Sequence, residues 1–396
     1  MLSHVKYSRN ISLAIFFTYL QIIKKITQMK NLVKITMTKY LIALIGLFTA
    51  VSFIGCDKDD DPKPDPPTPA DSQTFTVVNM VASDASITAT RVDPKLINAW
   101  GISFSPTGTP WISSTGDHTT AIYNGATGAQ QLAAVTIPTH GATTGGTPTG
   151  QVNNPTGAFP LANGNGARFI FAGLDGVISG WNGGAAATAM VDRNGTSVYT
   201  GLAIGNVGTD SFLYAADFKS GKVDKFNRTW VLQAASFVDP SLPAGYAPFN
   251  AQNIGGLIYV TYAQPDPASG KEKKGVGLGV VSVFNPDGSF VKRFVTGGKL
   301  NAPWGVAQAP TGWLTGAASS TVILIGNFGD GHINAYDAAN STWLGTLKNN
   351  GTVITVDGLW GISFKPAGAA ALNGDWLYFA AGPANETKGV FGYVTK

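Results

Sequence analysis

A Trp-Gly unit recurs three times in this chain and constrains the fold more than any other feature of the sequence. Each copy has a polar residue, then Trp-Gly, then a short apolar run that ends in proline. The copies are Asn98-Ala-Trp-Gly-Ile-Ser-Phe-Ser-Pro106, Asn301-Ala-Pro-Trp-Gly-Val-Ala-Gln-Ala-Pro310 and Asp357-Gly-Leu-Trp-Gly-Ile-Ser-Phe-Lys-Pro366. A fixed unit that recurs at a period of roughly 40–50 residues predicts a propeller or a solenoid.

The composition favours a large all-β domain. Of the 396 residues, 49 are glycine, 44% are hydrophobic and only 13% are charged. Short apolar runs separated by Gly, Asn, Asp and Pro are typical of strands joined by turns. We therefore expect an all-β fold, a β-propeller of about six four-stranded blades.

Six groups of strands follow from the apolar runs after residue 75. Their first strands are expected at 101–106, 156–161, 200–206, 250–255, 304–310 and 360–366. Residues 139–151 are interpreted as a Gly/Thr-rich loop, and residues 232–239 as the fourth strand of the third group. The sixth group has only three strands, so the run at 75–82 is expected to complete it and to close the ring. Closure leaves only short, protected strand edges, and the propeller domain is predicted to span residues 75–396.

The repeated tryptophan can be interpreted in two ways. At a fixed position in each repeat, it is expected to pack in the core between blades, and the glycine after it allows a close backbone approach. The alternative is an exposed platform for a sugar ring.

Residues 1–55 are predicted to be a signal peptide. They carry seven basic residues and no acid, and Lys39 precedes an apolar run that ends in small residues before Cys56. This run is too short for a stable membrane span. Residues 1–28 are interpreted as an over-extended gene start, with an alternative reading in which the apolar stretch from Ile11 to Ile23 is a membrane segment.

A lipid anchor is expected at Cys56. The sequence Phe53-Ile-Gly-Cys56 resembles a bacterial lipobox, which implies cleavage before Cys56 and a diacylglycerol on its thiol. Residues 56–74 form an acidic, Pro-rich linker, and its acidic run at 57–61 either resembles a surface-export signal of Bacteroidetes lipoproteins or is only well solvated. The expected location is the bacterial outer membrane or cell surface.

The net charge and the cysteine content exclude some kinds of partner and some kinds of metal site. Without residues 1–55, the chain keeps 20 basic and 23 acidic residues, a net charge of −3 that argues against a nucleic-acid partner. The single cysteine excludes a disulfide or a Cys-based metal site within one chain. The protein is expected to be a monomer.

The region from 75 to 396 resembles an uncharacterised family of secreted bacterial β-propeller proteins. The resemblance rests on the Trp-Gly strands and on Val78-Asn-Met-Val-Ala-Ser-Asp84, Ala381-Gly-Pro-Ala-Asn-Glu386 and Gly389-Val-Phe-Gly392. The chain is more distantly similar to NHL-repeat and gluconolactonase-type propellers. These include calcium-dependent lactonases whose metal sits in the central channel, so the resemblance implies a fold and a calcium hypothesis but no established reaction.

Two sets of polar residues are candidates for a site at one mouth of the channel. The first set precedes the innermost strands, where oxygens from several blades would suit calcium. Its members are Asn98, Asn154, Asn250, Asn301 and Asp357, of which Asn98, Asn154, Asn301 and Asp357 are the candidate metal ligands. The alternative is that these side chains satisfy loop backbone.

The second set lies between the second and third strands of the groups. Its members are Asp117, His118, Asp175, Asp217, Asp330, His332, Asn385 and Glu386. His118 and His332 occupy comparable loops and are hypothesised to meet across the channel as acid–base groups or metal ligands. The alternative for the set is ordinary turn chemistry.

Three functions remain open because no standard catalytic motif is present and only two glutamates, Glu272 and Glu386, occur in the chain. The favoured one is a lipid-anchored propeller that binds a glycan or a protein ligand at its channel mouth. The second is a calcium-dependent, lactonase- or lyase-like enzyme. The third is a structural surface protein whose channel is plugged by side chains.

Overall fold

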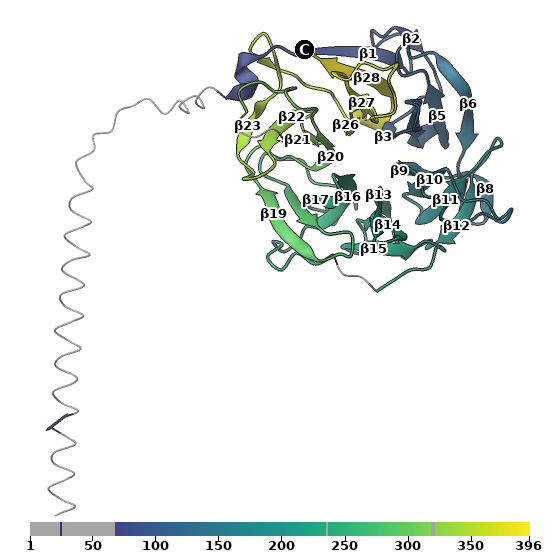
Figure 1. The fold of residues 1–396 in the computed structure, drawn as a ribbon, viewed down its shortest axis with the longest axis horizontal. Helices are drawn as coiled ribbons and strands as arrows, with labels where there is room; N and C mark the ends of the chain where they lie inside the picture. Colours follow the sequence, from purple (N-terminus) through teal and green to yellow (C-terminus); the bar gives the residue numbers. More distant parts are fainter. Residues whose placement is uncertain (1–23, 26–67, 235–236, 318–320) are drawn as a thin grey trace, which may run out of the picture. The chain divides into compact units, whose positions relative to one another are not determined.

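The chain folds as a six-bladed β-propeller, as the repeat predicts (Figure 1). The computed structural model describes residues 24–25, 68–234, 237–317 and 321–396. Cys56, most of the predicted linker and all of the predicted signal peptide except residues 24–25 lie outside the described residues. Among the described residues, no helix is long and apolar enough to cross a membrane.

Each blade is an antiparallel sheet, and its first strand lies nearest the middle of the ring (Figure 1). Blade 1 contains β3 (Ala99–Phe104), β4 (Pro110–Ser114), β5 (Thr119–Tyr123) and β6 (Gln130–Thr136). Blade 2 contains β9 (Pro148–Asn153), β10 (Phe169–Gly173), β11 (Val177–Trp181) and β12 (Thr188–Asp192). Blade 3 contains β13 (Tyr199–Val207), β14 (Asp210–Asp217) and β15 (Lys222–Asn227).

Blades 4 to 6 complete the circle. Blade 4 contains β16 (Ala247–Ile254), β17 (Leu257–Ala263), β18 (Val280–Phe284) and β19 (Phe290–Thr296). Blade 5 contains β20 (Pro303–Gln308), β21 (Val322–Asn327), β22 (Ile333–Asp337) and β23 (Trp343–Thr346). Blade 6 contains β26 (Leu359–Ser363), β27 (Leu377–Ala381), β28 (Val390–Thr395) and, as its fourth strand, β1 (Thr76–Ala82).

The predicted ring closure is confirmed. Strand β1 pairs antiparallel with β28, from Thr76 opposite Thr395 to Ala82 opposite Val390. The short β2 (Arg91–Val92) adds to the outer edge of β1. The first and last strands of the domain therefore share one blade, and opening the ring requires the loss of their whole ladder.

Two strand predictions are wrong. The first strand of blade 2 is β9 at 148–153 and not 156–161, so the predicted loop at 139–151 contains most of it as well as the hairpin of β7 (Pro138–Thr139) and β8 (Ala142–Gly145). Among the described residues of 232–239 there is no fourth strand of blade 3, only an isolated bridge between Phe226 and Leu232.

The segment that replaces this fourth strand is fastened to blade 4. Asp239 is buried and accepts hydrogen bonds from Ser282 Oγ at 2.6 Å and from Arg293 Nε at 2.5 Å. Burial alone would raise the pKa of Asp239, but these hydrogen bonds lower it to about 2. A buried ion pair thus holds this segment in place, because it has no sheet partner of its own as a fourth strand would.

Each innermost strand carries a register shift at the same place. In β20, Pro303 pairs with Asn327 and Gly305 with Gly326, which leaves Trp304 as an extra residue. The other innermost strands shift at the equivalent pairs, Trp100–Gly101, Thr149–Gly150, Thr200–Gly201, Phe249–Asn250 and Trp360–Gly361. A β-bulge re-aims the side chain at the extra residue, so the Trp-Gly unit is the sequence mark of a bulge that all six blades share.

The glycine of this pair allows neighbouring blades to approach. A Cβ on Gly361 would lie 2.8 Å from the carbonyl oxygen of Trp100, and one on Gly305 would lie 2.7 Å from that of Trp360. Blade 4 has Asn250 at this position, and its Nδ2 donates a hydrogen bond to the Trp304 carbonyl of blade 5 at 2.9 Å. The predicted role of the glycine, close backbone approach, is confirmed.

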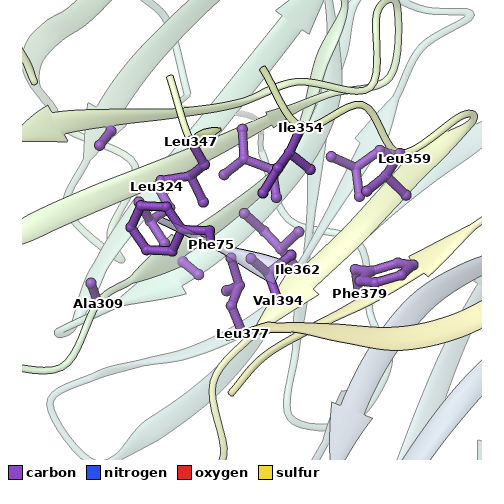
Figure 2. Close-up of a cluster of buried hydrophobic side chains, with 14 of the residues drawn as sticks. Phe75, Ala309, Leu324, Leu347, Ile354, Leu359, Ile362, Leu377, Phe379 and Val394 are labelled. Carbon is purple, nitrogen blue, oxygen red and sulfur yellow. The ribbon is translucent and has the colours of Figure 1, made fainter. Parts of the chain in front are cut away.

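The largest part of the core lies between blades 5 and 6. Figure 2 shows Leu324 of blade 5 and Phe379 and Val394 of blade 6 in this cluster, together with Phe75. Ala70, in the short 3₁₀ helix η1 (Pro69–Ser72), is fully buried in the same core. Packing against the propeller therefore begins before residue 75, the predicted start of the domain.

Candidate functional site

The three repeated tryptophans meet on the axis of the ring. We call the buried residues Trp100, Phe218, Phe249, Trp304, Phe328 and Trp360 the axial cluster. Trp360 stacks on Trp100 with ring centroids 3.6 Å apart and on Phe328 at 3.8 Å, and Trp304 meets both other tryptophans edge-on. Because these residues come from blades that are not all neighbours, the cluster closes the channel, which is the arrangement expected for the third function, a structural surface protein. The tryptophans are core residues, as expected, but they pack across the axis and not only between adjacent blades.

Blades 2 and 3 leave room for this packing. Their bulge residues are Thr149 and Thr200, which are smaller than the aromatic residues of the other four blades. Trp304 of blade 5 reaches across the ring, and its Nε1 donates a hydrogen bond to the Thr200 carbonyl at 2.9 Å. Trp360 Nε1 donates to Asn98 Oδ1 of blade 1 at 3.0 Å.

A pocket lies beside the axial cluster, at the end of the ring where each innermost strand begins. We call this end the upper mouth and the opposite end the lower mouth. The upper pocket has a volume of about 280 Å³, and Phe328 forms part of its wall. Its charged and amide groups are Lys271, Glu272, Lys274, Asp357, Asn385 and Glu386.

The insertion between β17 and β18 brings three of these groups to the mouth. Lys271 Nζ lies 2.8 Å from Glu386 Oε2, and this hydrogen bond raises the pKa of Lys271. Lys274 Nζ lies 4.1 Å from the centroid of the Phe328 ring, within cation–π range. Burial, and to a smaller degree the charge of Glu386, raise the pKa of Glu272 to about 6. Glu272 therefore changes charge close to neutral pH.

The segment α2 (Pro383–Glu386) forms the other side of the pocket, and its backbone has a rare conformation. Ala384, Asn385 and Glu386 are consecutive and have left-handed φ angles of 56°, 54° and 67°. Each such residue costs on the order of 1–3 kcal/mol and persists only when its surroundings fix it, as they often do at functional sites. Asp357 contributes, because its Oδ2 accepts a hydrogen bond from the Ala384 amide at 2.9 Å.

Three of the predicted site residues, Asp357, Asn385 and Glu386, thus lie together in the upper pocket. Other members of the two sets hold local structure. Asn301 Oδ1 accepts a hydrogen bond from the Gly275 amide at 2.6 Å, and its Nδ2 donates to Asp330 at 3.2 Å. Asn98 holds Trp360, as described above. The side-chain oxygens proposed as calcium ligands therefore accept separate hydrogen bonds from the protein. Calcium binding itself stays a prediction.

Asn154 does not lie with the rest of its set. It follows the innermost strand β9 and does not precede it, which places it at the lower mouth. Its Nδ2 donates to the carbonyls of Ala158 at 2.9 Å and Ala167 at 2.7 Å. The prediction is wrong because the first strand of blade 2 lies at 148–153 and not at 156–161, so Asn154 comes after it.

The remaining candidates lie at the upper mouth in separate turns. His118 Nδ1 contacts the Gly146 carbonyl at 2.9 Å, whereas His332 Nδ1 lies 3.6 Å from Asp330. The two histidines contact different partners, and no described hydrogen bond or ion pair joins them. Asp117, Asp175 and Asp217 each accept hydrogen bonds from residues of their own or adjoining turns. In the described ranges, no group of three or more His, Cys, Asp or Glu side chains is placed to hold a metal ion.

The site residues predicted from the sequence do not include Lys271, Glu272 and Lys274, which the structure places in the upper pocket. One signal could have identified them. The insertion 265–275 joins the second and third strands of its blade, as the loop with Glu386 does in blade 6, and such loops share one mouth of a propeller.

Two uncharacterised proteins of Acanthamoeba polyphaga mimivirus resemble this chain over most of both lengths. One is 32% identical over 304 residues, which cover 72% of this chain and 73% of that protein. The other is 31% identical over 337 residues, which cover 81% and 85%. No protein-family model matches the sequence. Because these relatives are viral, the bacterial source of the family stays a prediction.

Solved structures share the fold. A protein of unknown function from Bacteroides thetaiotaomicron aligns with a TM-score of 0.52 and 11% identity, covering 81% of this chain and 76% of that one. A streptogramin B lyase aligns with a TM-score of 0.47 and 13% identity, covering 81% and 97%. At this identity, the first similarity shows the propeller fold alone.

Proposed function

The chain belongs to the same family as the two mimivirus proteins, and we propose that its propeller binds a glycan in the upper pocket. One observation carries the proposal. The charged insertion and the strained α2 segment bring carboxylate, amide and ammonium groups together beside the aromatic wall formed by Phe328. Hydroxyl groups of a sugar find both donors and acceptors there, and a mostly preformed cavity with a few placed polar groups is typical of small-ligand sites.

A lipid anchor at Cys56 is the second part of the proposal. The basic and apolar signal, the lipobox-like ending and the Pro-rich linker support a propeller tethered to a cell envelope. Labelling of cells with a palmitate analogue tests it. Label is expected on the wild-type protein and not on Cys56→Ser, and equal labelling of both would exclude Cys56 as the anchor.

A glycan array probed with the full chain tests the binding function. Asp357→Asn and Glu386→Gln keep side-chain shape and remove one charge each. A hydrogen bond to a charged group is worth about 1.5–3 kcal/mol, so each variant is expected to weaken binding about 10- to 150-fold. If no glycan binds, or if both variants bind as well as wild type, the upper pocket is not a glycan site.

A second candidate is a lactonase- or lyase-like enzyme in the same pocket, and one observation favours it. Glu272, with its pKa raised to about 6, is suited to proton transfer near neutral pH. Incubation of bound glycans or lactones with the wild type and with Glu272→Gln distinguishes this function. Product formed by the wild type alone would establish it, and intact substrate in both samples would leave simple binding.

A further inference from the structure

The upper pocket brings together the only two glutamates of the chain. Glu272 belongs to the insertion 265–275 of blade 4 and Glu386 to α2 of blade 6, and both line the pocket. The charge of Glu386 contributes to the raised pKa of Glu272, so the two carboxylates lie close enough to interact. Because blade 5 separates these blades in the sequence, the closure of the ring places the two glutamates side by side.

The two carboxylates have different surroundings. Glu386 Oε2 lies 2.8 Å from Lys271 Nζ in an ion pair, and none of the described residues hydrogen-bonds to its Oε1. Glu272 is partly buried and forms no ion pair with the described residues. Burial, and after it the charge of Glu386, raise the pKa of Glu272 to about 6. Two neighbouring carboxyl groups whose environments differ in this way can act as an acid and a base.

The pocket is closed at its inner end. Phe328 belongs both to the wall of the pocket and to the axial cluster, which fills the channel. The volume of about 280 Å³ lies near the lower limit of small-ligand pockets, which is roughly 300 Å³. Because a glycan cannot pass through the ring here, it enters by its end, and one terminal sugar unit reaches the carboxylates.

We propose that the upper pocket hydrolyses the glycosidic bond of a terminal sugar unit, with Glu272 as the general acid and Glu386 as the general base. The inference rests on the proposed function, because it requires that this pocket binds a glycan. It goes beyond binding in that the two glutamates act on the bond that joins the bound unit to the rest of the glycan. A pair of carboxyl groups beside the bond is the usual machinery of this reaction.

The proposed step consumes one water molecule. Glu272 gives its proton to the glycosidic oxygen, and the bond from that oxygen to the anomeric carbon breaks with its electron pair left on the oxygen. Glu386 Oε1 takes a proton from a water molecule, whose oxygen forms the new bond to the anomeric carbon. Solvent then returns a proton to Glu272 and removes one from Glu386. The products are a free sugar and an alcohol, whereas a lyase would leave a double bond in one product.

A panel of 4-nitrophenyl glycosides of glucose, galactose, mannose and N-acetylglucosamine, in both anomers, tests the inference with the full chain at pH 6. The wild type is expected to release nitrophenol from at least one of them. Glu386→Gln keeps the shape of the side chain and should lower kcat/KM about 10²- to 10⁴-fold, as the loss of a general base does. Asp266→Asn is the matched control, because it removes a carboxylate from the same insertion and does not line the pocket.

The leaving group separates an acid from a structural residue. The sugar that is cleaved is tested again as its phenyl and its 2,4-dinitrophenyl glycoside. Glu272→Gln should lower kcat/KM about 10²- to 10⁴-fold for the phenyl glycoside and little for the other, because dinitrophenolate leaves without a proton. With the wild type, kcat/KM for the phenyl glycoside should fall above about pH 6, as Glu272 loses its proton among Lys271, Lys274, Asp357 and Glu386.

The outcomes for hydrolysis and for binding are distinguishable. If the array shows a bound glycan, and neither that glycan nor any aryl glycoside is cleaved, the inference is wrong and the binding function stands. If nothing binds on the array and nothing is cleaved, both are wrong. Equal rates for Asp266→Asn and Glu386→Gln, or an equal loss for Glu272→Gln with both leaving groups, would also overturn the assigned roles.

Discussion

Replacement of Trp360 by alanine should destabilise the propeller more than any other single truncation on the axis. Trp360 is fully buried and stacks on Trp100 at 3.6 Å and on Phe328 at 3.8 Å. Truncation of a buried Phe or Trp to Ala costs about 3–5 kcal/mol. Loss of the indole donor also leaves Asn98 Oδ1 unpaired, which adds about 1–3 kcal/mol. The expected loss is about 5 kcal/mol, a large part of the roughly 5–15 kcal/mol that stabilises a typical protein.

Urea unfolding of the full chain, followed by far-UV circular dichroism, measures this loss. Trp360→Phe separates the two contributions, because it keeps aromatic stacking and removes the donor. Trp376→Ala is the control, since Trp376 also stacks on a neighbouring ring, Tyr393 at 3.8 Å, but is only partly buried and lies outside the axial cluster. A loss below about 1.5 kcal/mol for Trp360→Ala, or one equal to that of Trp376→Ala, would refute the view that the axial cluster holds the ring together.

Three further predictions concern packing and pH. Gly361→Ala should cost about 1–3 kcal/mol, because its Cβ would lie 2.8 Å from the Trp100 carbonyl oxygen, and an unchanged urea midpoint would contradict this. The folded pKa of Glu272 is raised from 4.5 to about 6, so the free energy of unfolding should fall by up to about 2 kcal/mol as the pH rises through that range, and Glu272→Gln should not show the fall. The folded pKa of Asp239 is lowered from 3.8 to about 2, so its contribution of about 2 kcal/mol should be present above pH 4 and lost towards pH 2. The stability difference between the wild type and Asp239→Asn should shrink over the same acid range, and a constant difference would exclude this linkage.

The architecture could be predicted from the sequence because the repeat reports a backbone feature. Trp-Gly marks a bulge that each innermost strand needs, and the count of strands in the sixth group left one place for 75–82. The repeat unit could not be recognised in blade 2, where Thr149-Gly150 replaces Trp-Gly. The equivalent position in blade 3 also has a small residue, Thr200, whose carbonyl accepts the hydrogen bond from Trp304 across the axis, and this is a tertiary requirement that the local sequence does not carry.

The candidate site could be predicted only in part. The loops with Asp357, Asn385 and Glu386 were predicted to share one mouth, and they do, because strand order fixes the end of the ring at which a loop lies. The sequence does not determine how far an insertion folds over that mouth, so Lys271 and Glu272 were missed. The functions of the remaining polar residues depend on hydrogen bonds between segments far apart in the chain.

The most direct test of the central claim is a paired titration with the strongest glycan from the array. The full chain, Glu386→Gln and the control Gln308→Ala, whose side chain is exposed at the end of β20 and outside the upper pocket, are titrated side by side by calorimetry at neutral pH. If the upper pocket is the principal glycan site, Glu386→Gln should weaken binding about 10- to 150-fold, and Gln308→Ala should bind like the wild type. Equal affinities for the wild type and Glu386→Gln would contradict the claim.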